Sequence, residues 1–342
     1  MYVAIVGASG YTGAELLRIL ARYKDIEINQ ITSRQYAGKT LKDVFPVFTK
    51  SKYENLIFRE DLDFTLSDIY FLCLPHEASL ELAKQLYDNG KTVIDLSAAY
   101  RIKKAEVYKD YYGFEHNYPD LLEKAVYGLP EIYRDKIKTA RLIANPGCYP
   151  TSVLLGLYPL IRNNLLNQDN PIIVNALSGI SGAGRHLKED FMYPESYSNV
   201  YAYNITKHRH TPEMEDVIEN VSGKKISVRF TPHIIPVSRG MLSTINVFLE
   251  ISKKDLKDLY YETYKNEFFI RLQDRPSRIK EVIGTNFCDI FVDYDEKNKI
   301  VVITSAIDNL SKGASSQAVQ NLNLMLNKPE NYCLEDLPLF PW

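Results

Sequence analysis

The chain has 342 residues, 45% of them hydrophobic and 25% charged, with a formal net charge of −2. This composition is typical of a globular protein of about two domains, and it argues against nucleic acid and membrane as partners. The opening MYVAIVGASG is too short to cross a membrane and lacks a basic start, so we expect no signal peptide and a cytoplasmic location. The four cysteines are scattered without a CxxC pair, which suggests neither a disulfide framework nor a zinc site, so we predict no metal.

Short apolar runs alternate with helical patterns over the first 146 residues. The pattern predicts strands at 2–7, 26–33, 68–75 and 92–97, and helices at 12–23 and 77–90. Such alternation is typical of an α/β fold, here a Rossmann-type, doubly wound parallel sheet.

A glycine-rich turn, GASGYTG, joins the first strand to the first helix. Its glycines are Gly7, Gly10 and Gly13, in a GxxGxxG spacing. Glycines between a strand and a helix let the backbone approach a pyrophosphate, which binds at the helix N-terminus. We therefore predict dinucleotide binding; the alternative is a tight turn with no ligand.

The end of the second predicted strand indicates which dinucleotide is bound. An NAD site usually carries an acidic residue there to bind the ribose 2′-hydroxyl. This chain has Ser33 and Arg34 instead, and a guanidinium suits a 2′-phosphate. The sequence favours NADP over NAD, unless Arg34 is simply a solvated loop residue.

The next informative stretch is NPGCYPTS, residues 145–152, in which Cys148 directly precedes a hydrophobic helical pattern. A helix N-terminus lowers the pKa of a thiol, and the thiolate is the nucleophilic form. A dinucleotide-binding domain followed by such a cysteine suggests that an acyl group is held as a thioester and then reduced by hydride.

The rest of the chain changes character. It predicts an α+β domain with a mixed or antiparallel sheet, in which one amphipathic helix occupies 253–269. The predicted strands are 171–179, 225–237, 240–251, 288–295 and 299–307. A last helix, 311–326, is expected to return to the first domain. We therefore assign 1–146 with about 309–342 to an NADP-binding domain, and 147–308 to a catalytic, substrate and oligomerisation domain.

A thioester mechanism needs a proton shuttle near the sulfur, and KHRHTPE supplies candidates. His208 and His210 alternate between the cations Lys207 and Arg209, which suit an anionic substrate. The alternatives are a metal site, which lacks a third convincing ligand, and a solvated basic loop.

Eight motifs, in order along nearly the whole chain, resemble the N-acetyl-γ-glutamyl-phosphate reductase family, a relative of aspartate-semialdehyde dehydrogenase. They are GASGYTGAELLRIL, DLSAAYR, YGLPE, NPGCYPTS, SGISGAGR, KHRHTPE, PVSRGM and DNLSKGASSQAVQN. The resemblance implies the third step of arginine biosynthesis, in which NADPH reduces an acyl phosphate to a semialdehyde through a cysteine thioester.

The resemblance also implies roles for individual residues. Cys148 matches the nucleophile, and His210 matches the acid/base, with His208 as the fallback or as a substrate-binding group. Charge and motif make Arg185 and Arg239 candidates for anionic substrate groups. The residues that match the cofactor site are Gly7, Ser9, Gly10, Tyr11, Thr12, Gly13, Ser33, Arg34, Ser181, Gly182 and Asn309.

Two other functions stay open. A lysine-pathway reductase of the one-carbon-longer aminoadipyl phosphate, or another acyl-phosphate reductase, would share Cys148 and differ in the pocket around 178–239. A non-catalytic NADP-sensing protein would keep the glycine turn and lose Cys148 without effect. The sheet-rich second domain could bury one face against another subunit, so we expect a homo-oligomer, a dimer or a tetramer.

Overall fold

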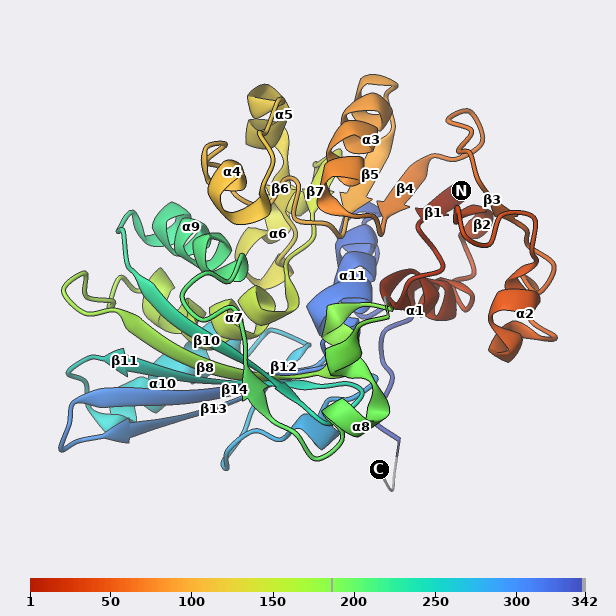
Figure 1. Cartoon of the computed structure of the whole chain (residues 1–342). Helices are drawn as coiled ribbons and strands as arrows, with labels where there is room; N and C mark the ends of the chain where they lie inside the picture. Colours follow the sequence, from red (N-terminus) through yellow and green to blue (C-terminus); the bar gives the residue numbers. More distant parts are fainter. Residues whose placement is uncertain (186, 340–342) are drawn as a thin grey trace. The chain divides into compact units, whose positions relative to one another are not determined.

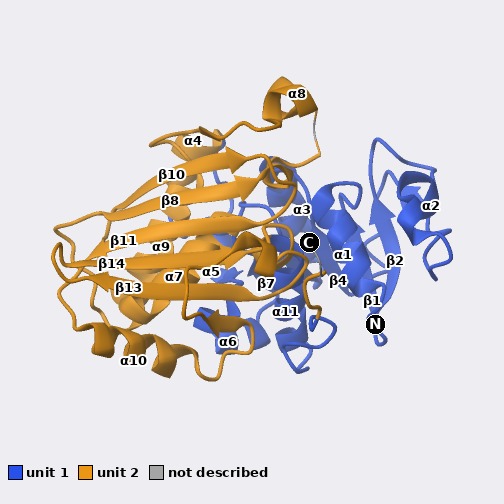
Figure 2. Cartoon of the chain, turned by 90° about the horizontal axis from the view of Figure 1, so that it is seen from below, with its two compact units in different colours: residues 1–106, 114–146, 314–335 blue, residues 107–113, 147–313, 336–342 orange. Residues whose placement is uncertain are grey.

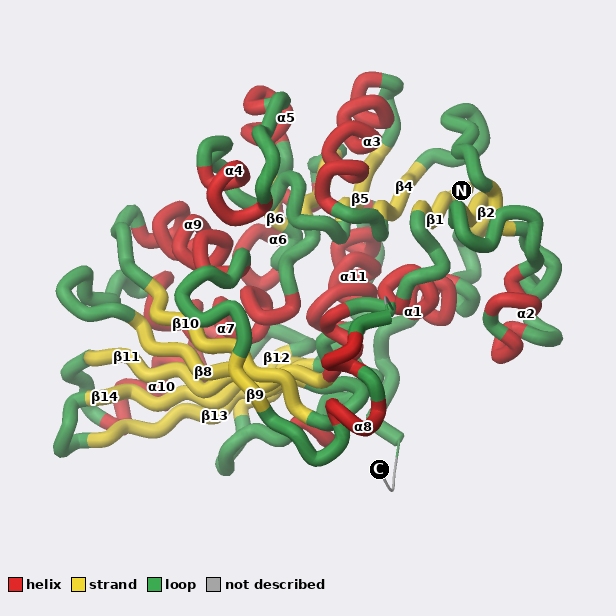
Figure 3. The backbone as a smooth tube through the Cα atoms, viewed as in Figure 1, coloured by secondary structure: helices red, strands yellow, loops and turns green. Residues whose placement is uncertain are grey.

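The computed structural model describes residues 1–185 and 187–339 (Figure 1). The chain divides into two compact units, shown in blue and orange in Figure 2. Unit 1 comprises 1–106, 114–146 and 314–335, and unit 2 comprises 107–113, 147–313 and the C-terminal residues from 336. Figure 2, which colours the units, and Figure 3, which colours the secondary structure, together show that each unit combines strands with helices.

Unit 1 contains a seven-stranded sheet in the order β3-β2-β1-β4-β5-β7-β6. Every neighbouring pair is parallel. The central strands are apolar and buried, as expected for a parallel sheet that helices cover. The strands are β1 (Tyr2–Val6), β2 (Glu27–Thr32), β3 (Phe58–Arg59), β4 (Ile69–Leu72), β5 (Thr92–Asp95), β6 (Val126–Tyr127) and β7 (Leu142–Ala144).

The helices of unit 1 include one from the far end of the chain. They are α1 (Tyr11–Leu20), α2 (Leu41–Val44), α3 (His76–Asp88), α5 (Pro119–Lys124), α6 (Pro130–Lys138) and α11 (Ser316–Met325). Helix α11 packs against α1 and α6. Its polar side chains are buried, and the amide nitrogens of Gln317 and Asn321 both donate to the carbonyl of Gly128.

Unit 2 contains a second seven-stranded sheet, in the order β12-β13-β14-β11-β8-β10-β9. The pairs β8–β10 and β12–β13 are parallel and the other pairs are antiparallel, so the sheet is mixed. The strands are β8 (Ile172–Gly179), β9 (Tyr201–Ala202), β10 (Val228–Ile235), β11 (Met241–Phe248), β12 (Ile270–Leu272), β13 (Cys288–Asp295) and β14 (Ile300–Ile307).

Helices cover one face of this second sheet. They pack behind the strands in Figure 2, with α7 against β11 and β14, α9 against β10, and α10 against β13. On β11 the side chains alternate between buried and half-buried, which is the pattern of a sheet with only one covered face. The helices of unit 2 are α4 (Val107–Tyr112), α7 (Cys148–Arg162), α8 (Tyr193–Ser196), α9 (His210–Ser222) and α10 (Lys253–Tyr264).

The predicted fold class is confirmed: a doubly wound parallel sheet and an α+β part with a mixed sheet. The compact units differ from the predicted domains at 107–113, which belong to unit 2, and at 309–313 and the residues from 336, which also belong to unit 2. The expected last helix begins with a π-helical turn, Ser311–Ser315, and the unit boundary follows Gly313 inside that turn. Among the described residues, no helix is both long and apolar enough to span a membrane.

Candidate active site

The glycine turn of unit 1 is built from close backbone approaches. Gly7 has φ +78°, and a Cβ there would lie 2.5 Å from the carbonyl oxygen of Cys73. A Cβ on Gly13 would lie 2.5 Å from the Cα of Ala8. Since both obstacles are backbone atoms, they cannot rotate away. The first and third glycines of the motif therefore set the path of the turn between β1 and α1.

The N-terminus of α1 faces the end of β2. Gly10 is the N-cap residue and has no side chain to cap the helix, so the first N–H groups of α1 are open to an anion. Ser9 and Ser33 share a hydrogen bond of 2.9 Å between their hydroxyl oxygens, which brings the glycine turn and the end of β2 together. Arg34 is exposed beside them. The predicted cofactor residues of unit 1, with Tyr11 and Thr12 in the first turn of α1, thus form one cluster.

Cys148 is the first residue of α7 in unit 2, preceded by the N-cap Gly147. Twelve of the fifteen residues of α7 are buried, so the helix is a core element that holds its first residue in a fixed place. The thiol is half-buried. The position has the features of a reactive cysteine: an N-terminal helical residue with partial access to solvent.

Tyr149 links Cys148 to the two histidines. Its ring centroid lies 5.7 Å from that of His208 and 5.8 Å from that of His210. The two imidazoles are 4.8 Å apart, and all three side chains are buried. Burial is the main cause that raises the pKa of both Tyr149 and Tyr203, and a negative charge on Cys148 adds to the rise. The structure therefore brings the predicted nucleophile and both candidate proton carriers into one cluster.

The surroundings of His208 keep its imidazole neutral. Burial lowers the pKa of His208 to about 4, with a smaller contribution from the charge of Arg209. The Nδ1 atom of His208 accepts a hydrogen bond from the backbone N–H of His210, at 3.1 Å. His208 is thus a neutral imidazole whose Nδ1 is occupied by the start of α9, where His210 is the first helical residue.

Glu213 belongs to this cluster and was missed in the sequence analysis. It is fully buried, and its Oε1 accepts the backbone N–H of Gly147 at 2.8 Å. The carboxylate of α9 therefore binds at the N-terminus of α7, next to Cys148. The indication in the sequence was its spacing, one helical turn after His210 in KHRHTPE.

A second cluster in unit 2 collects residues predicted for the cofactor. Ser181 and Gly182 lie in a short 3₁₀-helical turn, Ile180–Ala183. Asn309 donates from Nδ2 to Ser181 Oγ at 2.9 Å, and its Oδ1 accepts the N–H of Gly240 at 2.7 Å. Asn309 thus ties the turn after β8 to the turn before β11, which is a structural role.

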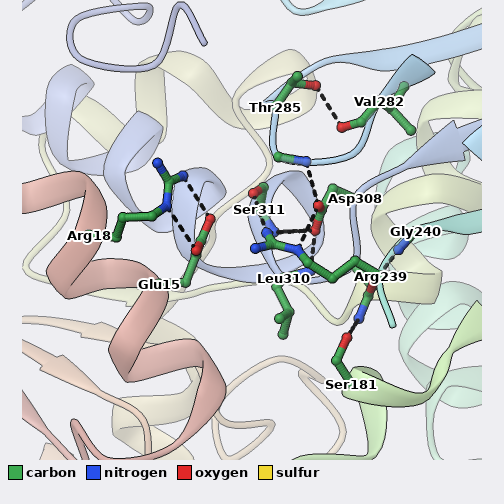
Figure 4. A network of polar contacts seen from close by, with 12 residues as sticks. Glu15, Arg18, Ser181, Arg239, Gly240, Val282, Thr285, Asp308, Leu310 and Ser311 are labelled. Atoms are coloured by element: carbon green, nitrogen blue, oxygen red, sulfur yellow. Dashed lines mark hydrogen bonds and ion pairs between the residues drawn. The ribbon is translucent and has the colours of Figure 1, made fainter. Parts of the chain in front are cut away.

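Arg239 is held by the protein itself. Its Nε and Nη2 donate to the two carboxylate oxygens of Asp308, at 2.9 and 3.0 Å, and Nη2 also donates to Ser311 Oγ at 2.9 Å (Figure 4). Asp308 is fully buried, so this ion pair is well shielded. The charge that we assigned to a substrate anion is largely neutralised internally, and the structure does not favour Arg239 for that role.

The other cations of the predicted site are exposed. Arg185 follows the 3₁₀ turn, and Lys207 and Arg209 flank His208. Their charge and their exposure make them candidates for meeting an anionic ligand.

Comparison with known proteins assigns a family to each of the two parts of the chain. Residues 2–140 match the family described as semialdehyde dehydrogenase, NAD binding domain, and residues 148–309 match semialdehyde dehydrogenase, dimerisation domain. The chain therefore belongs to the semialdehyde dehydrogenase family. The two matches support a nicotinamide cofactor and a homo-oligomer.

Within that family, three similar curated proteins share one name. N-acetyl-gamma-glutamyl-phosphate reductase of Aquifex aeolicus is 48% identical over 99% of this chain and 98% of its own length. The proteins of the same name from Halothermothrix orenii and Methanococcus maripaludis are 46% and 44% identical, over 99% and 96% of both chains.

Solved structures share the fold at low identity. Aspartate semialdehyde dehydrogenase II of Vibrio cholerae, complexed with ASA, matches with a TM-score of 0.73 and 18% identity, over 95% of this chain and 98% of that chain. Aspartate semialdehyde dehydrogenase of Candida albicans, with NADP, matches with a TM-score of 0.69 and 14% identity, over 96% and 99%. At these identities the likeness extends to the fold.

Proposed function

We propose that this protein reduces N-acetyl-γ-glutamyl phosphate to N-acetylglutamate 5-semialdehyde with NADPH, as the third step of arginine biosynthesis. The observation that carries the proposal is the half-buried thiol of Cys148 at the first residue of α7, directly followed by Tyr149, whose ring packs against the two buried imidazoles of His208 and His210. The shared name of relatives at 44–48% identity over nearly the whole chain supports the substrate.

Cys148 is the nucleophile of the proposed reaction. Its thiolate attacks the acyl carbon, a C–S bond forms, and the C–O bond to phosphate breaks, so that inorganic phosphate leaves and a thioester remains. Addition of hydride to the thioester carbon and of a proton to its oxygen gives a thiohemiacetal. Loss of a proton from its oxygen and cleavage of the C–S bond release the aldehyde and restore the thiolate. Splitting acyl reduction in this way replaces one difficult step with two easier ones.

His210 is the proposed acid/base. A group that carries a proton near neutral pH needs a pKa close to that range. Burial lowers the pKa of His208 to about 4, which is too low for this role. The Nδ1 of His208 is also occupied by the N–H of His210. His208 therefore orients the start of α9 and stays neutral, while the imidazole of His210 transfers the proton to and from the thiohemiacetal oxygen.

The cofactor is NADPH in this proposal. The uncapped N-terminus of α1, the tight glycine turn and the Ser9–Ser33 pair fit a pyrophosphate, and the exposed guanidinium of Arg34 fits the 2′-phosphate. When bound, NADPH supplies the hydride. We assign Ser181, Gly182 and Asn309 to the nicotinamide half.

The anionic groups of the substrate are assigned to Arg185, Lys207 and Arg209, because Arg239 is engaged by Asp308. The uncovered face of the sheet in unit 2 is the proposed contact between subunits, and a dimer or a tetramer would bury its half-exposed side chains.

The nucleophile is tested by Cys148→Ser. We expect turnover to be abolished while NADPH still binds and the melting temperature is unchanged, since the hydroxyl is a far weaker nucleophile at neutral pH. Alkylation should modify Cys148 before Cys73, because burial raises the pKa of the Cys73 thiol well above its usual range. Near-normal turnover by the serine variant would contradict the thioester mechanism and favour a cofactor-sensing role.

The substrate is tested in the reverse direction, with phosphate, NADP⁺ and a semialdehyde, by following cofactor reduction. N-acetylglutamate semialdehyde should give the highest kcat/KM, and aspartate semialdehyde should be poor because it has a free amine and a shorter chain. One methylene changes binding by only about 1–3 kcal/mol, so some turnover of the aminoadipate homologue is expected. A preference for aspartate semialdehyde would overturn the assignment, and a preference for the aminoadipate compound would move the enzyme to lysine synthesis.

A further inference from the structure

We infer that Gly313 is a positioning residue for the nucleophile: the π-helical turn Ser311–Ser315 presses its glycine against Cys148 and fixes where the sulfur lies. The inference rests on the proposed function, in which Cys148 is the nucleophile. It concerns unit 2 alone, since residues 147–313 form its main body.

The contact between the turn and the cysteine is closer than any side chain would allow. A Cβ built on Gly313 would lie 2.8 Å from the Cβ and 3.2 Å from the Cα of Cys148, and 3.3 Å from the carbonyl oxygen of Asp308. These atoms belong to the backbone or are fixed by it, so no rotation relieves the overlap. Carbon atoms in contact prefer about 3.5–4.0 Å, so an alanine methyl would push the two segments apart by about 0.7 Å or more.

Space, and not backbone conformation, is the reason for a glycine at 313. The glycines with positive φ in the described chain include Gly284 and Gly240, and Gly313 is not among them. Its backbone conformation is therefore open to alanine, and the only cost of a methyl group is steric. The close contact with Cys148 thus explains why residue 313 is a glycine. Short π-helical turns such as this one occur frequently at functional sites.

The turn cannot retreat easily, because Asp308 anchors its start. The carboxylate of Asp308 accepts the N–H groups of Leu310 and Ser311, at 2.8 and 3.0 Å, and its carbonyl oxygen accepts the N–H of Gly313 at 2.9 Å. The same carboxylate accepts the N–H of Gly284 at 2.7 Å and pairs with Arg239 (Figure 4).

The side chains of the turn add two further anchors. Ser311 Oγ accepts Nη2 of Arg239 at 2.9 Å, and the fully buried Lys312 lies with its Nζ 5.6 Å from the ring centroid of Phe269. The buried carboxylate of Asp308 accepts five hydrogen bonds, and the contacts of Ser311 and Lys312 add to them. The turn is therefore a rigid support for Cys148. A substitution at 313 must therefore displace the first turn of α7, and the Cys148 sulfur with it.

The test compares Gly313→Ala with Gly156→Ala, a matched control on the same helix as Cys148. A Cβ on Gly156 would also meet its nearest atom at 2.8 Å, but that atom is the flexible Cδ1 of Ile245. Both substitutions crowd unit 2 to a similar degree, and only the first crowds the cysteine.

For Gly313→Ala we expect kcat in the aldehyde assay to fall about 10- to 100-fold, with KM changed far less, because a displacement near 1 Å of a reacting group costs about that much. The rate constant for alkylation of Cys148 by iodoacetamide, followed by peptide mass spectrometry, should fall with it. Gly156→Ala should lower the melting temperature and leave both quantities near the wild-type values. If Gly313→Ala and Gly156→Ala have the same kcat and the same rate constant for alkylation of Cys148, the inference is overturned.

A second variant, Ser311→Ala, decides the matter if Gly313→Ala does not fold. It removes one hydrogen bond between the turn and Arg239, and we expect kcat and the Cys148 alkylation rate to fall together by about 2- to 10-fold. Unchanged alkylation in Ser311→Ala would then refute the support role. Activity in Cys148→Ser, by contrast, would reject the proposed mechanism itself, so the two failures are distinguishable.

Discussion

Replacing His208 with asparagine should reduce the loss of folding stability that the protein undergoes when the pH is lowered. The His208 imidazole is 5% exposed, and burial lowers its pKa from 6.5 to about 4. A histidine with a lowered folded-state pKa binds protons less readily in the folded than in the unfolded chain. Stability is therefore unaffected above about pH 7, falls as the pH drops through 6.5, and stops falling below about pH 4.

The size of the effect follows from that shift. Each pKa unit corresponds to about 1.4 kcal/mol, so the full loss is about 3 kcal/mol, of which about 2 kcal/mol should be lost between pH 8 and pH 5. Asparagine does not titrate in this range, and its carbonyl oxygen offers an acceptor in place of Nδ1 to the N–H of His210. The variant should start less stable at pH 8, because a buried ring is lost, but should lose about 2 kcal/mol less on acidification.

Urea unfolding at fixed protein concentration, from pH 8 to pH 5, measures this difference. Burial also lowers the pKa of His116. This histidine and the carboxylates are present in both proteins, so their contributions to the pH dependence of stability cancel in the comparison. If the stabilities of wild type and His208→Asn decline in parallel, His208 is not a buried neutral imidazole, and the assignment of the proton transfer to His210 loses its main support.

Three further substitutions test other parts of the structure. Arg34→Ala should weaken NADPH binding by about 1.5–3 kcal/mol and leave NADH binding nearly unchanged in a fluorescence titration; an equal loss for both would assign Arg34 another role. Gly13→Ala should destabilise the fold by about 1–3 kcal/mol, seen as a lower melting temperature, and should weaken the binding of both NADPH and NADH, because its methyl group overlaps the backbone of Ala8. Unchanged binding of both cofactors would show that the turn can move to accommodate the methyl group. Asp308→Ala should cost about 3–5 kcal/mol of unfolding free energy, because Arg239 and the N–H groups of the turn lose their acceptor; a loss below about 1 kcal/mol would mean that water replaces the carboxylate.

The parts of the fold that the sequence predicts well are those with local causes. Strand β1 and helix α1 follow from an apolar run, three glycines and a helical repeat, and each of these patterns spans only a few residues. The start of α7 at Cys148 is local in the same sense, since Pro-Gly precedes a hydrophobic helical pattern. The two-residue strands β3 and β6 have no such pattern, because they exist through pairing with β2 and β7.

The candidate site divides in the same way. The two histidines could be proposed from composition, but the burial that keeps His208 neutral depends on tertiary packing, which no local pattern reveals. The engagement of Arg239 by Asp308 joins residues 69 positions apart, and it depends on the antiparallel register of β11 with β14, which brings the end of one strand to the start of the other. An arginine in a family motif therefore indicates importance without indicating whether its partner is a ligand or the protein.

Glycines in these motifs need the same distinction. Gly7 is required by a positive φ as well as by space, so both a turn and a close approach explain it. Gly13 and Gly313 have ordinary backbone conformations, and each is explained by the atom it faces: the backbone of Ala8 in one case and Cys148 in the other. The first contact shapes a turn that fits a cofactor, while the second lies against the group that carries the proposed chemistry. Alanine at 313 should therefore change the reactivity of one thiol more than it changes the stability of the fold, which is the reverse of what a packing glycine would give.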